Sequence, residues 1–299
     1  MTGLILMYHR VADAPEDAYG LAVRPDRFAA HAEHLSRLGC VVPLNEIRQP
    51  SKTLKIAITF DDGYADNAVT AAPLLASLQL PVTYFITSGR LCGQHFWWDR
   101  LAMGLLDASS PHRGLDVEIR GHEIWLALNT LDARRTALRF LHRRLRPLPP
   151  EELQMTVDEL LQRMGAPEPP EAARTMTEDQ LRAMSRAETV EVGAHTRTHL
   201  QLRDQVHGLQ RNEVFGSIAD LVAITGRPVT SFAYPFGNQS AVGAVAPRLA
   251  FEAGCELACS TDVGVVDRRT DPFRLPRLNV RDWPVDEFAA RLEEARHSA

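Results

Sequence analysis

The chain has 299 residues, of which 45% are hydrophobic and 24% charged, and its formal net charge is −5. This composition is typical of a folded globular protein rather than a disordered chain, and the acidic balance argues against a general nucleic-acid binder, which needs basic groups on the phosphates. Since no apolar run approaches the ~20 residues of a membrane span and no leader pattern precedes Leu4, we expect a cytoplasmic protein, with peripheral membrane contact left open.

Short β-rich runs alternate with amphipathic helical patterns along most of the chain. The expected strands are Leu4–Tyr8, Lys55–Phe60, Val82–Thr87, Val190–Ala194, Ser231–Tyr234, Glu256–Ser260 and Leu275–Val280. The expected helices are Arg27–Leu38, Asp66–Leu78, Glu178–Ala187, Leu209–Thr225, Val242–Ala253 and Val285–Ala295. This alternation predicts an α/β fold with a largely parallel sheet, and about seven such units suit a (β/α) barrel.

Residues from about 94 to 175 interrupt the alternation, because they contain little strand pattern and a long helical run. We interpret them as a mostly helical insertion in a single domain that spans residues 1–299. Trp97 and Trp98 could stack on a sugar ring or anchor the core of the insertion. The arginine-rich helix around Leu131–Leu145 could contact an anionic membrane or a phosphorylated carrier, or simply face solvent.

Two adjacent carboxylates, Asp61 and Asp62, follow an expected strand and precede Gly63. Active sites of β/α folds gather at the carboxyl ends of the strands, and two like charges this close favour a positive partner. The pair therefore indicates a divalent metal ion. The alternative is a turn in which one aspartate caps the next helix.

His195 and His199 follow another expected strand at a spacing of four residues. Two imidazoles at this spacing can converge on one ion, although either could equally belong to an ordinary turn. Combined with a strand-end aspartate, they give the open ligand set of a catalytic metal centre. We expect Asp62, His195 and His199 to bind a divalent ion, foremost zinc, with cobalt, nickel or iron as alternatives, and Asp61 to serve as a base.

The third motif is the loop Ser231–Ser240, which contains an aromatic–Pro–aromatic–Gly turn. Such a rigid loop can present a backbone N–H to a developing oxyanion. By itself, it could equally be a tight loop with packed aromatic rings.

The sequences T-F-D-D-G, H-T-x-x-H and Y-P-F-G, in this order, resemble the NodB-type polysaccharide deacetylases, also called carbohydrate esterase family four. The resemblance covers most of the chain apart from the insertion. It implies a distorted (β/α) barrel and a metal-dependent removal of acetyl groups from acetylated sugars. It also implies Asp61 as the catalytic base, Asp62, His195 and His199 as the metal ligands, and the backbone N–H of Phe236 as the oxyanion donor.

Two departures from the family pattern concern the base and the acid. The arginine that orients the base in the family is replaced by Ala233, and Arg274 or Arg277 could take its place or pair with structural carboxylates. The late histidine that acts as the acid is missing, so we predict His9 as the acid, as in a branch of the family with this histidine ahead of the first motif. The alternative is that His9 is a half-buried histidine at the end of a strand.

The sequence thus predicts a metal-dependent hydrolase that removes an N-acetyl or other acyl group from an amino sugar in a glycan or glycan precursor. Tyr234, Trp98 and Arg277 are the candidate substrate contacts. A degenerate barrel that only binds glycans is one alternative. A glycosidase is another, which adjacent carboxylates disfavour because its two carboxyl groups stand ~5–9.5 Å apart across the substrate. The oligomeric state is left open.

The remaining histidines, His31 among them, have no ligand-type neighbour at a suitable spacing and are interpreted as surface or incidental residues. The four cysteines are scattered, which favours buried free thiols over a disulfide framework.

Overall fold

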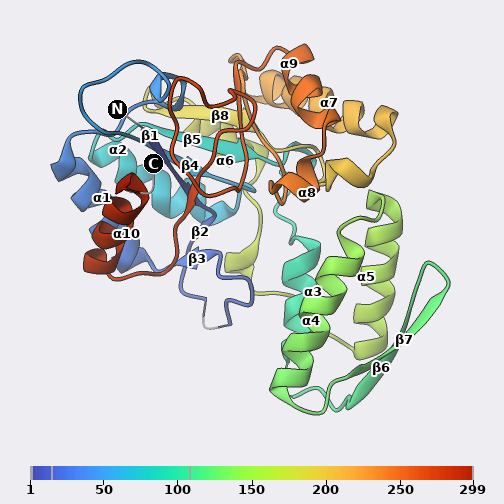
Figure 1. Cartoon of the computed structure of the whole chain (residues 1–299). Helices are drawn as coiled ribbons and strands as arrows, with labels where there is room; N and C mark the ends of the chain where they lie inside the picture. Colours follow the sequence, from blue (N-terminus) through green and yellow to red (C-terminus); the bar gives the residue numbers. More distant parts are fainter. Residues whose placement is uncertain (1–2, 15, 108, 298–299) are drawn as a thin grey trace. The chain divides into compact units, whose positions relative to one another are not determined.

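The structure is a computed structural model that describes residues 3–14, 16–107 and 109–297. It contains two compact units, one formed by Met1–Gly93 with Thr175–Ala299 and the other by Gln94–Arg174. Figure 1 shows the elements of each unit.

The first unit is built on a seven-stranded sheet in the order β10-β9-β8-β5-β4-β1-β11, and its ladders are parallel. The strands are β1 (Gly3–Tyr8), β4 (Lys55–Phe60), β5 (Val82–Ile86), β8 (Val190–Ala194), β9 (Ser231–Ala233), β10 (Leu257–Cys259) and β11 (Leu278–Asn279). A small two-stranded sheet pairs β2 (Arg10–Val11) with β3 (Ala22–Val23). Every expected strand is therefore present.

The last segment of the sheet brings its two edges together. Leu275 forms a parallel bridge with Cys259 of β10, and Leu278 pairs with Leu6 of β1. The chain from Leu275 to Asn279 thus bonds first to one edge of the sheet and then to the other. This arrangement is a distorted (β/α) barrel, as predicted.

Helices surround this sheet (Figure 1). They are α1 (Pro25–Leu38), α2 (Ala72–Ser77), α6 (Glu178–Met184), α7 (His207–Thr225), α8 (Gln239–Val242), α9 (Val245–Glu252) and α10 (Val285–His297), with short 3₁₀ turns η1 (Leu44–Glu46), η3 (Ser88–Arg90) and η5 (Leu202–Asp204). Two expected helices differ in detail. The expected helix Asp66–Leu78 begins as a π-helical turn, η2 (Asn67–Ala71), and continues as α2. The expected helix Val242–Ala253 is interrupted at Gly243, where φ is +69°, between α8 and α9.

The two faces of the sheet pack into different cores. Leu4 and Leu6 of β1 belong to the larger core, which also contains the buried side chains of the helices, whereas Ile5, Ala57 and Phe85 belong to a smaller core inside the barrel. Because side chains alternate along a strand, Asp61 continues the inward row of Ala57. The fold therefore points the first aspartate of the pair into the barrel.

His31 on α1 is a core residue, so the interpretation that it lies at the surface is wrong. The residue is fully buried, its ring stacks on Phe288 of α10 with centroids 4.0 Å apart, and Nε2 lies 2.9 Å from the carbonyl oxygen of Trp283. All four cysteines are free; Cys255 and Cys259 are buried as expected, but Cys92 is exposed.

The second unit contains α3 (Trp97–Leu106), β6 (Gly114–Ile119), β7 (His122–Ala127), α4 (Leu131–Leu145), α5 (Pro150–Met164) and the turn η4 (Glu171–Ala173). It is mostly helical, but β6 and β7 form an antiparallel hairpin that the sequence reading missed. Its turn uses left-handed residues, Arg120 and Gly121. Whether this unit is an insertion in one deacetylase-like domain stays a prediction.

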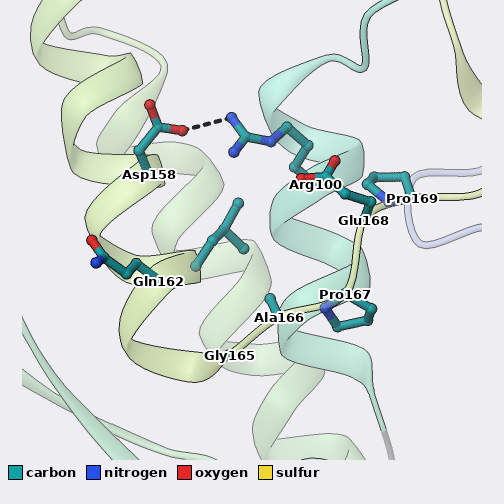
Figure 2. Close-up of a pocket in the computed structure, with 9 residues that line it drawn as sticks. Arg100, Asp158, Gln162, Gly165, Ala166, Pro167, Glu168 and Pro169 are labelled. Carbon is teal, nitrogen blue, oxygen red and sulfur yellow. Dashed lines mark hydrogen bonds and ion pairs between the residues drawn. The ribbon is translucent and has the colours of Figure 1, made fainter.

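A cavity of about 320 Å³ lies within this second unit, between α3, α5 and the segment that follows α5 (Figure 2). Two of its charged lining residues pair with each other, because Arg100 donates to Asp158 over 2.7 Å. We therefore do not assign a ligand to it.

Candidate active site

The proposed functional residues follow the carboxyl ends of three strands of the parallel sheet. Asp61 and Asp62 follow β4, His195 follows β8, and His9 follows β1. The register pairs Tyr8 with Phe60, so the next residues, His9 and Asp61, leave adjacent strands at the same level. The parallel sheet thus gathers residues that lie far apart in the sequence.

Asp62, His195 and His199 form a buried cluster whose potential ligand atoms all lie within 4.8 Å of one another. Asp62 Oδ1 lies 3.5 Å from Nε2 of His195 and 3.2 Å from Nε2 of His199.

The orientation of His195 suits metal binding. Its Nδ1 lies 2.7 Å from the carbonyl oxygen of Ala233, which can only accept a hydrogen bond, so Nδ1 carries the proton. In the neutral ring, Nε2 then presents a lone pair toward Asp62. Metal-binding histidines are typically oriented by such a partner on the other nitrogen.

The donor set fits a divalent ion. It combines two imidazoles with one carboxylate, a ligand set found in catalytic metal sites. Among the described residues, Asp62 Oδ1 finds no donor with acceptable hydrogen-bond geometry although it is buried. A cation would satisfy this atom.

The backbone around these residues is held in unusual conformations. Asp62, Thr196, His199 and Phe236 all have positive φ values, between +59° and +75°. Residues other than glycine adopt this left-handed backbone conformation at a cost of about 1–2 kcal/mol. Such strain persists where the surrounding structure fixes it and clusters at functional sites.

Asp61 forms a bidentate ion pair with Arg277. The Nη1 and Nη2 atoms of Arg277 each lie 2.6 Å from one carboxylate oxygen, and Nε donates to the carbonyl of Ser260 over 2.8 Å. Burial opposes ionisation of Asp61, but the positive charge of Arg277 outweighs it and holds the pKa of Asp61 below its usual value. Of the two arginines that the sequence left open, Arg277 is therefore the one that contacts Asp61, whereas Arg274 donates to the carbonyl of Gly243.

His9 lies close enough to Asp61 and Asp62 to interact with both electrostatically. Its carbonyl oxygen accepts a hydrogen bond of 2.8 Å from Nδ2 of Asn67, which fixes the backbone at this point. Burial lowers the pKa of His9 and the two aspartates oppose that shift. Its Nδ1 is buried and has no hydrogen-bond partner among the described residues.

A match to the model of a known protein family shows which family the chain belongs to. Residues 48–138 and 140–253 match the model described as polysaccharide deacetylase. The chain belongs to this family, whose NodB-type members form carbohydrate esterase family four. Members of the family use a divalent metal ion, and the cluster of Asp62, His195 and His199 could bind one.

Solved structures of the family share the fold. The Streptococcus pyogenes deacetylase PplD in complex with acetate is 17% identical with a TM-score of 0.63, and 97% of each chain is covered. A polysaccharide deacetylase from Bacillus cereus is 18% identical with a TM-score of 0.61, covering 97% of this chain and 68% of the other. A de-N-acetylase from Aggregatibacter actinomycetemcomitans is 14% identical with a TM-score of 0.57, covering 94% and 96%. No curated protein sequence gave a match.

The three predicted substrate contacts need correction. Arg277 is fully buried and its guanidinium is paired with Asp61, so it does not face a sugar. Tyr234 is 1% exposed and its hydroxyl donates to the carbonyl of Phe273 over 3.0 Å. Trp98 is 3% exposed and stacks on Phe96 with centroids 4.2 Å apart, which favours the alternative that it is a core residue of the second unit.

Phe236, the predicted oxyanion donor of this deacetylase family member, lies beside His199 of the Asp62–His195–His199 cluster. Its ring meets that of His199 edge to face with centroids 4.8 Å apart. Its carbonyl oxygen accepts from Oγ1 of Thr261 over 3.2 Å and from the N–H of Asn238 over 2.6 Å. These bonds fix the peptide that follows Phe236.

Sequence reasoning missed Asn67, which holds the backbone of His9, and Glu213, which holds the backbone between His195 and His199. Neither is part of a motif, and their partners are fixed only by the packing of α7 and η2 against the strand ends. Within the described residues, no helix combines the length and the apolar character that a membrane crossing requires.

Proposed function

We propose that this protein is a metal-dependent hydrolase that removes the N-acetyl group from an amino sugar within a glycan or glycan precursor. The observation that carries the proposal is the buried Asp62–His195–His199 cluster next to Asp61, which Arg277 orients through two hydrogen bonds. The family supports a glycan substrate. Two similar structures, a deacetylase with acetate and a de-N-acetylase, support the acetyl group and the amide bond.

The ion we propose is zinc, because two imidazoles and one carboxylate suit it; cobalt, nickel and iron suit the same ligands. When bound, a divalent ion polarises the acyl carbonyl and makes water a stronger acid at neutral pH. Asp62, His195 and His199 would hold it.

The chain's own residues would then divide the proton transfers. Asp61, kept ionised by Arg277, takes the proton of the attacking water. The backbone N–H of Phe236 donates to the oxyanion that develops on the acyl oxygen. His9 gives a proton to the amine nitrogen as the C–N bond breaks, because an amine leaves slowly without one.

The domain organisation and the cellular location of the protein are also proposals. We propose that residues 1–299 form one deacetylase domain with the insertion at about 94–175. The cytoplasmic location expected from the sequence stays a prediction.

The test is acetate release from N-acetylglucosamine oligomers by the zinc-loaded protein and its Asp61→Asn variant. We expect the variant to lose about 10²–10⁴-fold in kcat and to keep its metal content, because Asp61 is not a ligand. Asp116→Asn, which changes an exposed carboxylate on β6, is the matched control. Near-normal turnover by Asp61→Asn would sink the mechanism.

The same assay separates the alternatives. Reducing sugar released without acetate would indicate a glycosidase. Bound metal without turnover of any amide substrate would indicate a barrel that only binds glycans.

A further inference from the structure

The loop that joins His195 to His199 is anchored by a buried carboxylate on α7. Glu213 is 2% exposed, and its Oε2 accepts hydrogen bonds of 2.9 Å from the backbone N–H groups of Arg197 and Thr198. Its Oε1 accepts a third bond of 2.9 Å from the hydroxyl of Thr198. One carboxylate therefore binds both residues at the centre of the histidine motif.

The backbone of this loop is shaped to receive an anion. Thr196 has a φ of +62°, and the two N–H groups that follow it converge on the same oxygen of Glu213. Successive N–H groups next to a left-handed residue form a concave anion-binding nest. His199, which ends the loop, is left-handed as well, with a φ of +60°. The carboxylate thus stabilises the turn that directs both imidazoles toward Asp62.

A second anchor lies next to the first. The guanidinium of Arg197 donates to both oxygens of Asp220, over 2.8 Å from Nε and 2.7 Å from Nη2, and Ser88 donates to the same carboxylate. Gly216 leaves room for this side chain, because a Cβ there would lie 2.4 Å from Cζ of Arg197. Both anchors come from one face of α7, since Glu213 and Asp220 are seven residues apart.

We propose that Glu213 is a positioning residue for the metal ligands His195 and His199. Its hydrogen bonds go to Arg197 and Thr198, so it fixes the strained backbone between the two histidines. The inference rests on the proposed metal site and extends it to a residue outside the motifs. Partners that orient metal ligands typically change metal affinity by about 10–100-fold when they are removed.

The experiment compares Zn²⁺ affinity, measured by competition with a chelating indicator, among variants in which a hydrogen-bonded glutamate is replaced. Glu213→Met keeps the size of the side chain and removes every acceptor, and we expect a loss of about 10–100-fold. Glu213→Gln keeps one oxygen for the two N–H groups and should restore most of the affinity. Glu191→Met is the control, because Glu191 is a half-buried carboxylate that accepts from Ser231 and Thr83 instead of the loop, and we expect wild-type affinity.

Two further measurements keep the result decisive. Thr198→Val removes the hydroxyl that donates to Glu213 and should cost about fivefold in affinity. This variant provides the test if Glu213→Met does not fold. Amide hydrogen exchange of residues 196–200 in the metal-free protein should accelerate in Glu213→Met and not in Glu191→Met.

Unchanged affinity and exchange in Glu213→Met and Thr198→Val, or an equal loss in Glu191→Met, would overturn the inference. If the wild-type protein bound no Zn²⁺, the proposed metal site would fail, and the exchange rates would still decide whether Glu213 holds the loop.

Discussion

At the scale of single residues, the buried pair of Asp61 and Arg277 gives a coupled prediction. Removing one partner of a buried ion pair typically destabilises a protein by about 3–5 kcal/mol, because a charge is left without compensation. We therefore expect Arg277→Met to lower the free energy of unfolding by about this amount, measured by urea denaturation. The double variant Asp61→Asn/Arg277→Met should recover part of the loss, and a strictly additive double variant would contradict the coupling.

The substitution Arg277→Met should also change how kcat/KM depends on pH. Arg277 holds the pKa of Asp61 below its usual value, so its removal raises that pKa. Since the base works only when ionised, the acidic limb of kcat/KM should move to higher pH in Arg277→Met. A limb that stays in place would mean that a different group serves as the base.

His9 gives the second residue-scale prediction. If it protonates the leaving amine, His9→Ala should slow hydrolysis of an N-acetyl amide by about 10²–10⁴-fold. An aryl acetate, whose leaving group needs no proton, should be affected far less. Rates on the two substrates, measured side by side at one pH, test this. An equal loss on both would assign His9 a role other than that of the acid.

At the scale of elements, α4 shows how a pattern of charges can mislead. Six arginines between positions 134 and 146 suggested a basic face, but Arg134 is buried and donates to the carbonyls of Leu105, Asp107, Ser110 and His112 over 2.9–3.1 Å. It ties α4 to the chain between α3 and β6. The remaining arginines of the helix are partly or fully exposed.

This contact predicts a local effect on stability. Arg134→Met leaves four carbonyls without their donor and should make residues 94–174 cleavable by protease at lower denaturant. Hydrogen bonds to charged groups contribute about 1.5–3 kcal/mol each, so the shift should be large. Arg135→Met, on the exposed side of the same helix, is the control and should behave like wild type. Equal cleavage of both variants would contradict this account.

At the scale of the whole molecule, His31 links stability to pH. Burial lowers its pKa to about 4, although the carbonyl of Trp283 opposes this shift. The unfolded chain takes up the proton near pH 6.5, so the stability gained by burying the neutral ring is complete above that pH and is lost as the pH falls toward 4. Between pH 7 and 5, we expect a loss of about 2 kcal/mol from this residue.

The variant His31→Gln tests this, because glutamine does not titrate. Its free energy of unfolding, measured in urea at pH 7 and pH 5, should fall less than that of the wild type by about 2 kcal/mol. Parallel declines in the two proteins would show that His31 is not responsible.

Much of the fold could be predicted from the sequence because its signals are local. The seven strands are short apolar runs, and the helices have their own periodicity. Asp61, Asp62, His195 and His199 could be placed at one edge because parallel strands all end there. The hairpin of β6 and β7 was missed, although Leu115, Val117 and Ile119 alternate as buried residues, because the surrounding pattern is helical.

By itself, then, the sequence determined the order of strands and helices and the residues that follow each strand, since both are set by neighbours along the chain. The tertiary structure decided which charges meet. Arg277 lies 216 residues from Asp61, and Glu213 holds a loop 15 residues before it. His31 and Arg134 look exposed in sequence and are buried. A charged or polar side chain is stable in the interior only with a suitable partner, and such partners are brought together by packing between elements, which no local pattern records.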